Sequence, residues 1–351
     1  MAKPLYYFNG DQTKANLDFP HLGFDYTRCP YRFEAVYEFG VWRVRGLLED
    51  NQLHLPEGSQ CVHYGQQLFE GMKVQTGADG KIYAFRPRDN ARRINEGARY
   101  LCGAEIPEEL FIRGVEEVTL ANLPFVPPHG SGAALYVRPF WLGVDDNVGV
   151  KPARNYIFRI YVTPVGPYFP GGFGPDQGKS FMVSKYDRAA PHGTGHVKAG
   201  GNYAGSFLPT LEARSEGFAG AIFMDPAEHK NIEEIGAANF LGFKNDTLVT
   251  VDSPSILRSI TRVSLLEIAE KVYGWKTEER LINLDELDDF DAAACCGTAA
   301  VLTWIKGITD PKSGRSWEFP YDERWVKLYD QLTGIQTAKV DDPFGWRYEI
   351  K

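Results

Sequence analysis

The sequence predicts a mixed α+β protein with two domains, and three observations lead to this prediction. The chain has 351 residues, which is enough for two domains with a large core. Each half mixes strand-like and helix-like segments. Between the halves lies the stretch 164–175, in which Pro and Gly are too dense for regular structure, so it is the best domain boundary in the chain.

The first half carries clear signals for both kinds of element. A short strand is expected over 81–85, because the segment is apolar and ends before Pro87. The other expected elements are two helices, over 91–100 and 107–123, and two long strands rich in β-branched and aromatic residues, over 133–142 and 156–163.

The second half continues the alternation of strands and helices. Short apolar runs predict strands near 181–184, 219–224, 240–243 and 248–251, and apolar periodicity predicts helices over 261–272 and 321–332. After Tyr203 the apolar residues recur at helical spacing as far as Gly217. Pro209 lies within that run, so the helix must begin just before it.

Composition and charge exclude several classes of protein. Hydrophobic residues make up 43% and charged residues 24%, which is typical of globular proteins, and the net charge of −8 argues against nucleic-acid binding. Residues 1–7 lack the apolar core of a signal peptide, and no apolar run approaches a membrane span. The five Cys are irregularly spaced, which favours reduced thiols and a cytoplasmic location.

Lys198 has the most informative local setting. Gly195, Gly200 and Gly201 surround it, and so many Gly allow backbone to approach a bulky ligand closely. A helix is expected to begin nearby, and a helix start is a natural place for an anion or a flat cofactor. Local sequence leaves two interpretations open: Lys198 is a nucleophile, or it is a solvated charge on a turn.

Three further clusters have both a chemical and a structural interpretation. Glu233 and Glu234 precede small residues and a strand, so one carboxylate could hold a ring nitrogen protonated, or both could be solvated in a loop. The stretch 259–262 opens a helix, where Ser259 is either a simple N-cap or part of a phosphate site. The stretch 296–300 is either an anion-binding turn or a plain buried strand.

Taken together and in order, these clusters resemble the branched-chain amino acid aminotransferases, which are fold-type IV enzymes of pyridoxal 5′-phosphate. The resemblance covers roughly residues 22–302, and its motifs lie at 63–73, 85–93, 136–139, 164–169, 198–203, 234–239, 260–262 and 297–300. So many spaced motifs in one order make chance agreement very improbable.

The resemblance implies a fold and its domains. A smaller N-terminal α/β domain is expected over 1–165 and an interdomain loop over 166–178. A larger C-terminal pseudo-barrel domain, which binds the cofactor, is expected over 179–351.

The resemblance also implies roles around pyridoxal 5′-phosphate. Lys198 forms the aldimine with the cofactor and later carries a proton as the catalytic base. Glu234 pairs with the pyridine nitrogen, and Tyr203 hydrogen-bonds the ring oxygen. The phosphate is held by Arg93, by the backbone N–H groups of Ile260 and Thr261, and by the Thr298 hydroxyl.

Further residues are assigned to the substrate by the same resemblance. The α-carboxylate is expected against Thr298 and Ala299, with Tyr64 and Arg138 on its far side. The side-chain pocket is expected to use Phe69, Tyr136, Tyr26, Ala237 and Ala238, with Tyr168 closing it.

The implied reaction is a ping-pong transfer of the amino group from L-leucine, L-isoleucine or L-valine to 2-oxoglutarate. The implied partners are these small molecules and further copies of the chain, as a homodimer or a hexamer, with no nucleic acid, membrane or metal. The family usually has Leu-Pro-Gly before Ile260, where this chain has Leu257-Arg258-Ser259. The small residues Ala237 and Ala238, with the Tyr26 hydroxyl, suggest a pocket that also admits larger apolar or aromatic side chains.

Three alternatives compete with this interpretation. A D-amino acid transaminase or an aminodeoxychorismate lyase shares the fold, but Tyr136-x-Arg138 favours the L-specific branched-chain type. A non-catalytic relative is disfavoured because Lys198 and Glu234 are present. A metal site at His192 and His196 needs one helical face, which the intervening Gly-Thr-Gly disfavours.

Overall fold

A computed structural model describes residues 14–169, 171 and 173–351. The stretch 1–7, judged above for a signal peptide, and two positions of the Pro- and Gly-rich segment, Pro170 and Gly172, lie outside these residues. The chain divides into two compact units. Unit 1 is the described part of Met1–Pro167 with Val197–Gly200 and Gly334–Lys351, and unit 2 is the described part of Tyr168–His196 with Gly201–Thr333. The domain ranges expected from the sequence stay a prediction.

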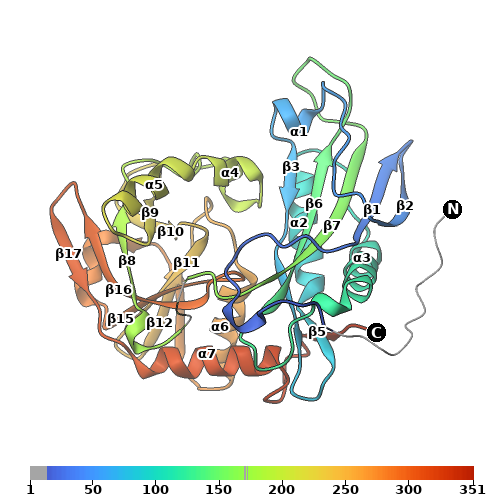
Figure 1. Cartoon of the computed structure of the whole chain (residues 1–351). Coiled ribbons are helices and arrows are strands. Elements are labelled where there is room, and N and C mark those ends of the chain that lie inside the picture. The colour runs from blue at the N-terminus through green and yellow to red at the C-terminus, as the bar shows by residue number, and fades with distance from the viewer. Residues whose placement is uncertain (1–13, 170, 172) are drawn as a thin grey trace. The chain divides into compact units, whose positions relative to one another are not determined.

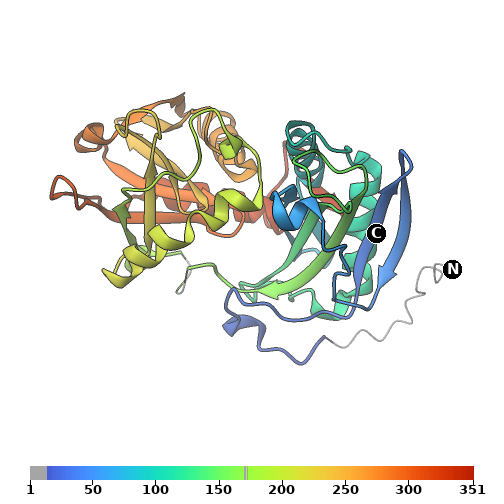
Figure 2. The ribbon, with the colours of Figure 1, turned by 90° about the horizontal axis from the view of Figure 1, so that it is seen from above.

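Unit 1 is built on an antiparallel sheet (Figure 1). Within the described residues it has eight strands in the order β18-β5-β4-β6-β7-β1-β2, with β3 paired to β6. They are β1 (Arg32–Glu38), β2 (Val41–Leu48), β3 (Gln67–Phe69), β4 (Met72–Thr76), β5 (Ile82–Phe85), β6 (Ala134–Gly143), β7 (Tyr156–Val165) and β18 (Arg347–Glu349). Figure 2 shows β1 and β2 as a hairpin at the edge of this sheet.

The helices of unit 1 pack beside its sheet, the two longer ones through apolar residues. They are α1 (Gln60–His63), α2 (Pro87–Tyr100) and α3 (Glu108–Ala121), with 3-10 turns at Phe19–His21 and Leu123–Phe125. In α2 the buried residues Ala91, Ile94 and Ala98 recur every three or four positions, so one face packs into the core. That core also takes in Phe111 of α3 and Phe158 of β7.

Unit 2 contains a closed barrel. The strand order β11-β15-β16-β8-β9-β10 returns to β11, because β10 and β11 also pair with each other. These strands are β8 (Lys179–Val183), β9 (Gly220–Met224), β10 (Asn231–Ile235), β11 (Ala238–Lys244), β15 (Ala292–Gly297) and β16 (Val301–Asp310). The closure gives the pseudo-barrel that the sequence predicted.

Further elements extend the barrel of unit 2. The added strands are β12 (Thr247–Val251), β13 (Lys276–Arg280), β14 (Ile282–Asn283) and β17 (Arg315–Glu318). The helices are α4 (Gly200–Ala204), α5 (Phe207–Ser215), α6 (Ile260–Lys271) and α7 (Glu323–Gln336), with 3-10 turns at Pro175–Gln177, Thr194–His196 and Leu284–Asp289. Apolar side chains that include Ile222, Phe240 and Ile305 form the hydrophobic core of the barrel.

Most expected elements are confirmed to within a few residues, and one expectation needs correction. The Pro- and Gly-rich segment was expected to be irregular from residue 164, but β7 continues to Val165. Pro164 lies opposite Leu135 of β6, beyond the part of β7 that pairs with β1, so its missing N–H costs no pairing with β1. In the part of the chain that the structure describes, no helix combines the length and apolar character needed to cross a membrane.

Candidate active site

The backbone of Lys198 is tied to the sheet of unit 1. The carbonyl of Lys198 accepts a hydrogen bond from the N–H of Phe69 at 3.1 Å, and Ala199 forms an isolated bridge with Leu68. The Lys198 Nζ lies 4.9 Å from the centre of the Phe69 ring. The amine is therefore held over an aromatic face next to β3, rather than extended on a solvated turn.

Arg93 is oriented by a fully buried carboxylate. Its Nε and Nη2 donate to the two oxygens of Glu70, each at 2.7 Å, and Asn90 Nδ2 adds a third hydrogen bond at 2.7 Å. Burial by itself raises the pKa of Glu70, but Arg93, Lys198 and the hydrogen bond from Asn90 together hold that pKa below its usual value of 4.5. This bidentate pair fixes the guanidinium plane.

A group of aromatic residues in unit 1 surrounds Arg138. Its guanidinium lies 4.8 Å from the Phe69 ring centre and 5.2 Å from that of Tyr136, and Nη2 is 3.4 Å from the Tyr136 hydroxyl. A Cβ on Gly71 would lie 1.9 Å from that hydroxyl, so only Gly leaves room for Tyr136 here. The predicted pocket residues Phe69, Tyr136 and Arg138 are thus brought together.

The remaining tyrosines of the predicted pocket lie in more open positions. Tyr26 is 55% exposed and packs edge-on against Tyr161 at 5.7 Å. Tyr64 is 41% exposed, and its hydroxyl donates to the carbonyl of Val148. Tyr168, in unit 2, packs edge-on against Phe169 at 4.9 Å. The assignment of Tyr26, Tyr64 and Tyr168 to the substrate therefore stays a prediction.

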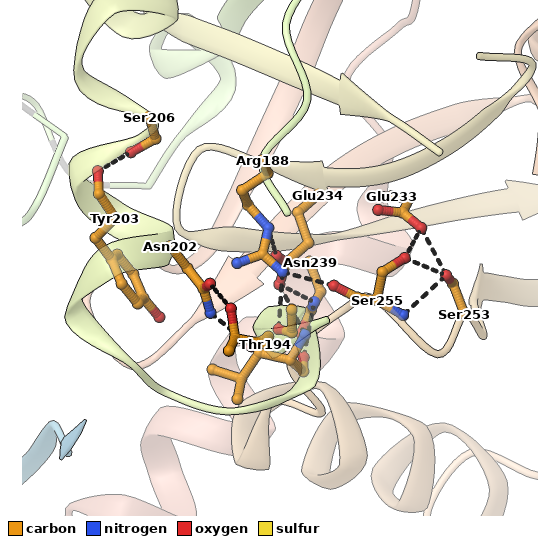
Figure 3. Close-up of polar contacts among 12 residues, drawn as sticks. Arg188, Thr194, Asn202, Tyr203, Ser206, Glu233, Glu234, Asn239, Ser253 and Ser255 are labelled. Carbon is orange, nitrogen blue, oxygen red and sulfur yellow. Dashed lines mark hydrogen bonds and ion pairs between the residues drawn. The ribbon is translucent and has the colours of Figure 1, made fainter. Parts of the chain in front are cut away.

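Glu234 is the central carboxylate of unit 2, and Figure 3 shows its surroundings. One of its oxygens, Oε2, forms an ion pair with Nε of Arg188, and the two side chains are only 5% and 4% exposed. The other oxygen, Oε1, accepts from Asn239 Nδ2 and from the N–H of Leu257, both at 3.2 Å. Both oxygens are therefore anchored, so the carboxylate has one fixed orientation.

Arg188 also binds two loops of unit 2. Its Nη2 donates to the carbonyl of Gly195 at 2.9 Å and to that of Ser255 at 2.8 Å (Figure 3). A Cβ on Gly195 would lie 1.9 Å from the Ser255 carbonyl oxygen, so the two loops touch at a position that requires Gly. Gly195 comes three residues before Lys198, and Ser255 comes shortly before α6.

The turn that leads to Tyr203 is closed by its own hydrogen bonds. Asn202 Nδ2 donates to the carbonyl of Thr194 at 2.7 Å, and the Thr194 hydroxyl donates back to Asn202 Oδ1 at 2.6 Å. The hydroxyl of Ser206 then donates to the carbonyl of Tyr203 at 2.6 Å (Figure 3). These contacts fix the backbone on both sides of Tyr203, whose ring is half-buried.

The helix start at α6 has the geometry of an anion-binding site. Ser259 is confirmed as its N-cap, since its hydroxyl accepts from the N–H of Arg262 at 3.3 Å. Ile260 and Thr261 open the helix, so their N–H groups belong to the first turn, where the helix dipole favours negative charge. The predicted phosphate residues of α6 therefore occupy the expected position on the helix.

Two tight turns of unit 2 lie side by side. Gly236, with φ of +59°, and Ala237 connect β10 to β11, and residues 298–300 connect β15 to β16. Because β11 pairs with β15, the turns are neighbours: a Cβ on Gly297 would lie 3.6 Å from the Ala237 carbonyl oxygen. Ala237, Ala238, Thr298 and Ala299 are thus gathered at one end of the barrel.

Sequence reasoning missed the residues that orient the predicted ones. Glu70 lies in the motif at 63–73, and its position directly before Gly71 was the feature that could have indicated a role. Arg188 lies ten positions before Lys198, and no local pattern marks it. Asn239 ends the motif at 234–239, but the sequence assigned it no role. In the structure its Nδ2 donates to Glu234 and to the carbonyl of Leu257.

Comparison with known proteins adds evidence that is independent of this geometry. Residues 67–308, more than half of the chain, match the family model described as amino-transferase class IV. The chain belongs to the class IV aminotransferases. This confirms the family resemblance that the spaced motifs indicated.

Relatives within this aminotransferase family are similar over nearly the whole chain. The branched-chain-amino-acid aminotransferase of Haemophilus influenzae is 45% identical over 344 residues, which cover 96% of this chain and 99% of the relative. The enzyme of the same name from Helicobacter pylori is 45% identical over 336 residues, covering 95% of this chain and 98% of the relative.

Solved structures of the same family support the fold. A branched-chain amino acid aminotransferase from Escherichia coli aligns with a TM-score of 0.76 at 23% identity, covering 92% of this chain and all of that one. One from Thermoproteus uzoniensis, solved with norvaline, aligns with a TM-score of 0.76 at 22% identity, also over 92% of this chain and all of that one. The fold predicted from the sequence is therefore confirmed.

Proposed function

We propose that this class IV aminotransferase transfers the amino group of a branched-chain L-amino acid to 2-oxoglutarate, with pyridoxal 5′-phosphate as cofactor. The products are a branched 2-oxo acid and glutamate. The observation that carries the proposal is the 45% identity, over 96% of this chain, to an enzyme named for the branched-chain reaction. The site geometry supports it from the residues upward.

The residues of the two units fit the chemical groups of the cofactor. The phosphate needs a bidentate cation and helix N–H groups, and Arg93 and the first turn of α6 offer them. The ring nitrogen needs a fixed carboxylate, and Glu234 is anchored on both oxygens. The aldehyde needs an amine, which Lys198 offers. When bound, pyridoxal 5′-phosphate supplies an electron sink for the bond to the substrate α-carbon.

Lys198 is proposed as the catalytic base. Its carbonyl is fixed by Phe69 and its amine lies over the Phe69 ring, so Nζ is confined to a small region. An amine confined in this way would already be positioned to take a proton from a bound substrate and return it. Glu70, which lies close enough to interact with both Lys198 and Arg93, keeps the positive charges of this region balanced.

Glu234 and Tyr203 are proposed to set the charge on the cofactor ring. The ion pair with Arg188 fixes the Glu234 carboxylate, which is proposed to pair with the ring nitrogen and hold a proton there. Tyr203, on the turn fixed by Asn202 and Ser206, is assigned to the ring oxygen. The Thr298 hydroxyl joins Ile260 and Thr261 at the phosphate.

The substrate is assigned to the two tight turns of the barrel and to the Arg138 group. We assign the α-carboxylate to the backbone of Thr298 and Ala299 and to Arg138 and Tyr64. We assign the apolar side chain to Phe69, Tyr136, Tyr26, Ala237 and Ala238, with Tyr168 as the closing residue. Arg138 lies 4.8 Å from the centre of the Phe69 ring and 5.2 Å from that of Tyr136, so the cation proposed for the α-carboxylate adjoins the residues proposed for the apolar side chain.

An absorbance titration tests the core of the proposal. The purified protein is expected to show the band of a lysine-bound cofactor, and addition of L-leucine is expected to convert it to the band of pyridoxamine phosphate. Lys198→Ala is expected to lose both the first band and at least about 10³-fold in turnover, because nucleophile and base are one residue. A colourless wild-type protein that takes up no pyridoxal phosphate contradicts the proposal.

Kinetics over a series of donors test the substrate range. We propose that Leu, Ile and Val are the best donors, and that Met, Phe and Tyr react as well, because Ala237 is small and Tyr26 is 55% exposed. Strict rejection of all but the first three would remove the wider-pocket proposal. Turnover of D-amino acids would favour a D-amino acid transaminase instead.

We also propose a cytoplasmic homodimer as the smallest assembly. Within the described residues all five Cys are free thiols, which agrees with a reducing compartment. Sedimentation of the holoenzyme at micromolar concentration tests the assembly, and a monomer that is fully active contradicts it.

A further inference from the structure

Two neighbouring glutamates of β10 are both buried, because the strand carries a bulge at this point. Ile232 pairs with Met224 and Glu234 pairs with Phe223, so Glu233 is an extra residue opposite a single step of β9. Glu233 is 2% exposed and Glu234 is 4% exposed. In a regular strand one of the two would face away, whereas a bulge changes the direction of its side chains.

Glu233 binds the hydroxyls of two serines in the loop before α6. Its Oε1 accepts from Ser253 Oγ at 2.6 Å and from Ser255 Oγ, which makes an even closer contact (Figure 3). The two hydroxyls are 3.0 Å apart, and the N–H of Ser255 lies 3.3 Å from Ser253 Oγ. Glu233 thus fixes the side chain of Ser255 from one direction.

The same loop is held from the other direction by the Glu234 group. Arg188 binds the carbonyl of Ser255 at 2.8 Å, and Glu234 accepts from the N–H of Leu257 at 3.2 Å. Ser255 is therefore bound at its hydroxyl by Glu233 and at its carbonyl by Arg188. Three residues after Leu257 the chain enters α6 at Ile260.

We propose that Glu233 is a positioning residue for the phosphate-binding turn at Ile260 and Thr261, and that it acts through Ser255. The proposal rests on the proposed function, since it assumes that this helix start binds the phosphate of the cofactor. Glu233 holds the loop 253–257 against the Arg188 contact, so the N–H groups at the start of α6 keep their orientation before any ligand binds. Glu233 is therefore expected to affect binding of the phosphate group, and not binding of the aldehyde or of the ring.

Paired titrations of the apoenzyme with pyridoxal phosphate and with pyridoxal, which lacks the phosphate, test the proposal. The Kd for pyridoxal phosphate is expected to rise about tenfold in Glu233→Gln and in Ser255→Ala, as for other residues that orient ligand-binding groups. The Kd for pyridoxal is expected to stay within about twofold, because no phosphate is involved. Ser255→Thr keeps the hydroxyl and is expected to bind both like the wild type.

Thr250→Val is the matched control for loss of a buried hydroxyl. The Thr250 hydroxyl, on β12, donates to the carbonyl of Phe240 at 2.6 Å, so its partner lies on β11 and not in the loop 253–257. It is expected to leave both Kd values unchanged even if thermal stability falls. Should Glu233→Gln fail to fold, the contrast of Ser255→Ala with Ser255→Thr carries the test.

The outcomes separate this inference from the proposed function. Equal effects of Glu233→Gln on both ligands, or no effect on either, overturn the positioning role while wild-type binding of pyridoxal phosphate stays intact. A wild-type apoenzyme that binds no pyridoxal phosphate overturns the proposed function itself.

Discussion

Each unit contains a buried Arg–Glu pair supported by an asparagine, but the two pairs are built differently. In unit 1, Arg93 donates from both Nε and Nη2 to Glu70, so each carboxylate oxygen accepts one hydrogen bond from the same guanidinium. In unit 2, Arg188 gives Nε to Glu234 but Nη2 to the carbonyls of Gly195 and Ser255. The first pair joins the residue after β3 to α2, and the second joins Arg188 to positions 195, 234 and 255.

The difference indicates a reversal of roles. In unit 1 the arginine is the residue proposed to bind the ligand, and the carboxylate orients it. In unit 2 the carboxylate is proposed to bind the ligand, and Arg188 orients it. A similar ion pair therefore positions a cation in one unit and an anion in the other, and substitutions can separate the two arrangements.

The largest effect is expected from removing each arginine. Arg93→Met and Arg188→Met are each expected to lower the free energy of unfolding by about 3–5 kcal/mol, because each removes the arginine that is bound directly to a buried carboxylate. Urea unfolding measures the loss.

Double substitutions then separate the two pairs. Replacing Glu70 with Met as well is expected to recover much of the loss in unit 1, since an apolar pair needs no counter-charge and Asn90 Nδ2 keeps a contact of 3.4 Å with the carbonyl of Gly71. Replacing Glu234 with Met is expected to recover little in unit 2, because the carbonyls of Gly195 and Ser255 still lack their donor. Equal recovery in both units would show that the two pairs are alike.

A smaller effect is expected from adding a methyl group where the loops meet. Gly195→Ala is expected to cost about 1–3 kcal/mol, because the new Cβ would lie 1.9 Å from a backbone oxygen that Arg188 holds in place. Gly200→Ala is the matched control: its Cβ would meet the side-chain amide of Gln67 at 2.5 Å, and that side chain can move. Chemical unfolding of both variants measures the difference, and equal losses would mean that the loop junction in unit 2 is not rigid.

The charge of Glu70 predicts a pH dependence. Its pKa is below the ordinary 4.5, so the stability it contributes is present above that pH and is lost as the pH falls through the lowered folded-state value. Below pH 4.5, the free energy of unfolding of the wild type should therefore fall more steeply than that of Glu70→Gln, by up to about 1.4 kcal/mol per pH unit. Parallel slopes in the two proteins would mean that folding does not lower the pKa of Glu70.

The smallest effect is expected in the reactivity of buried thiols, which measures local unfolding in each unit separately. Burial raises the pKa of Cys29 to about 12 in unit 1 and that of Cys296 to about 12 in unit 2, so both should react far more slowly than the exposed Cys102. In Arg93→Met we expect Cys29 to become reactive first, and in Arg188→Met we expect Cys296. Mass spectrometry of labelled peptides measures this order, and simultaneous exposure would show that the two units unfold as one.

Much of the fold followed from local pattern. The apolar spacing of Ala91, Ile94 and Ala98 predicted α2, and Ser259 was recognised as a possible N-cap. The closure of the barrel through β10 and β11 could not be predicted from periodicity. Periodicity predicts that a segment is a strand, but it does not say which strands pair with each other. Composition alone placed Pro164 in the irregular segment. In the structure it belongs to β7, at a position where β7 pairs with β6 and not with β1.

The candidate site was predicted best where a residue stands in a motif. Lys198, Glu234 and Ser259 could be named from their neighbours. Arg188 could not, since its three partners come from positions 195, 234 and 255, which meet only after folding. The direction of the Glu233 side chain could not be predicted from the sequence either, because a bulge depends on the pairing of two strands and not on one segment.

The most direct test of the account is to trap and locate the lysine that binds the cofactor. Borohydride reduction of the holoenzyme, followed by peptide mapping, is expected to place a single phosphopyridoxyl group on Lys198. Lys73 is the internal comparison, because burial lowers its pKa to about 8 and makes it another amine able to react. Label on Lys198 alone is the predicted result, and label on Lys73 or on no lysine would contradict the account.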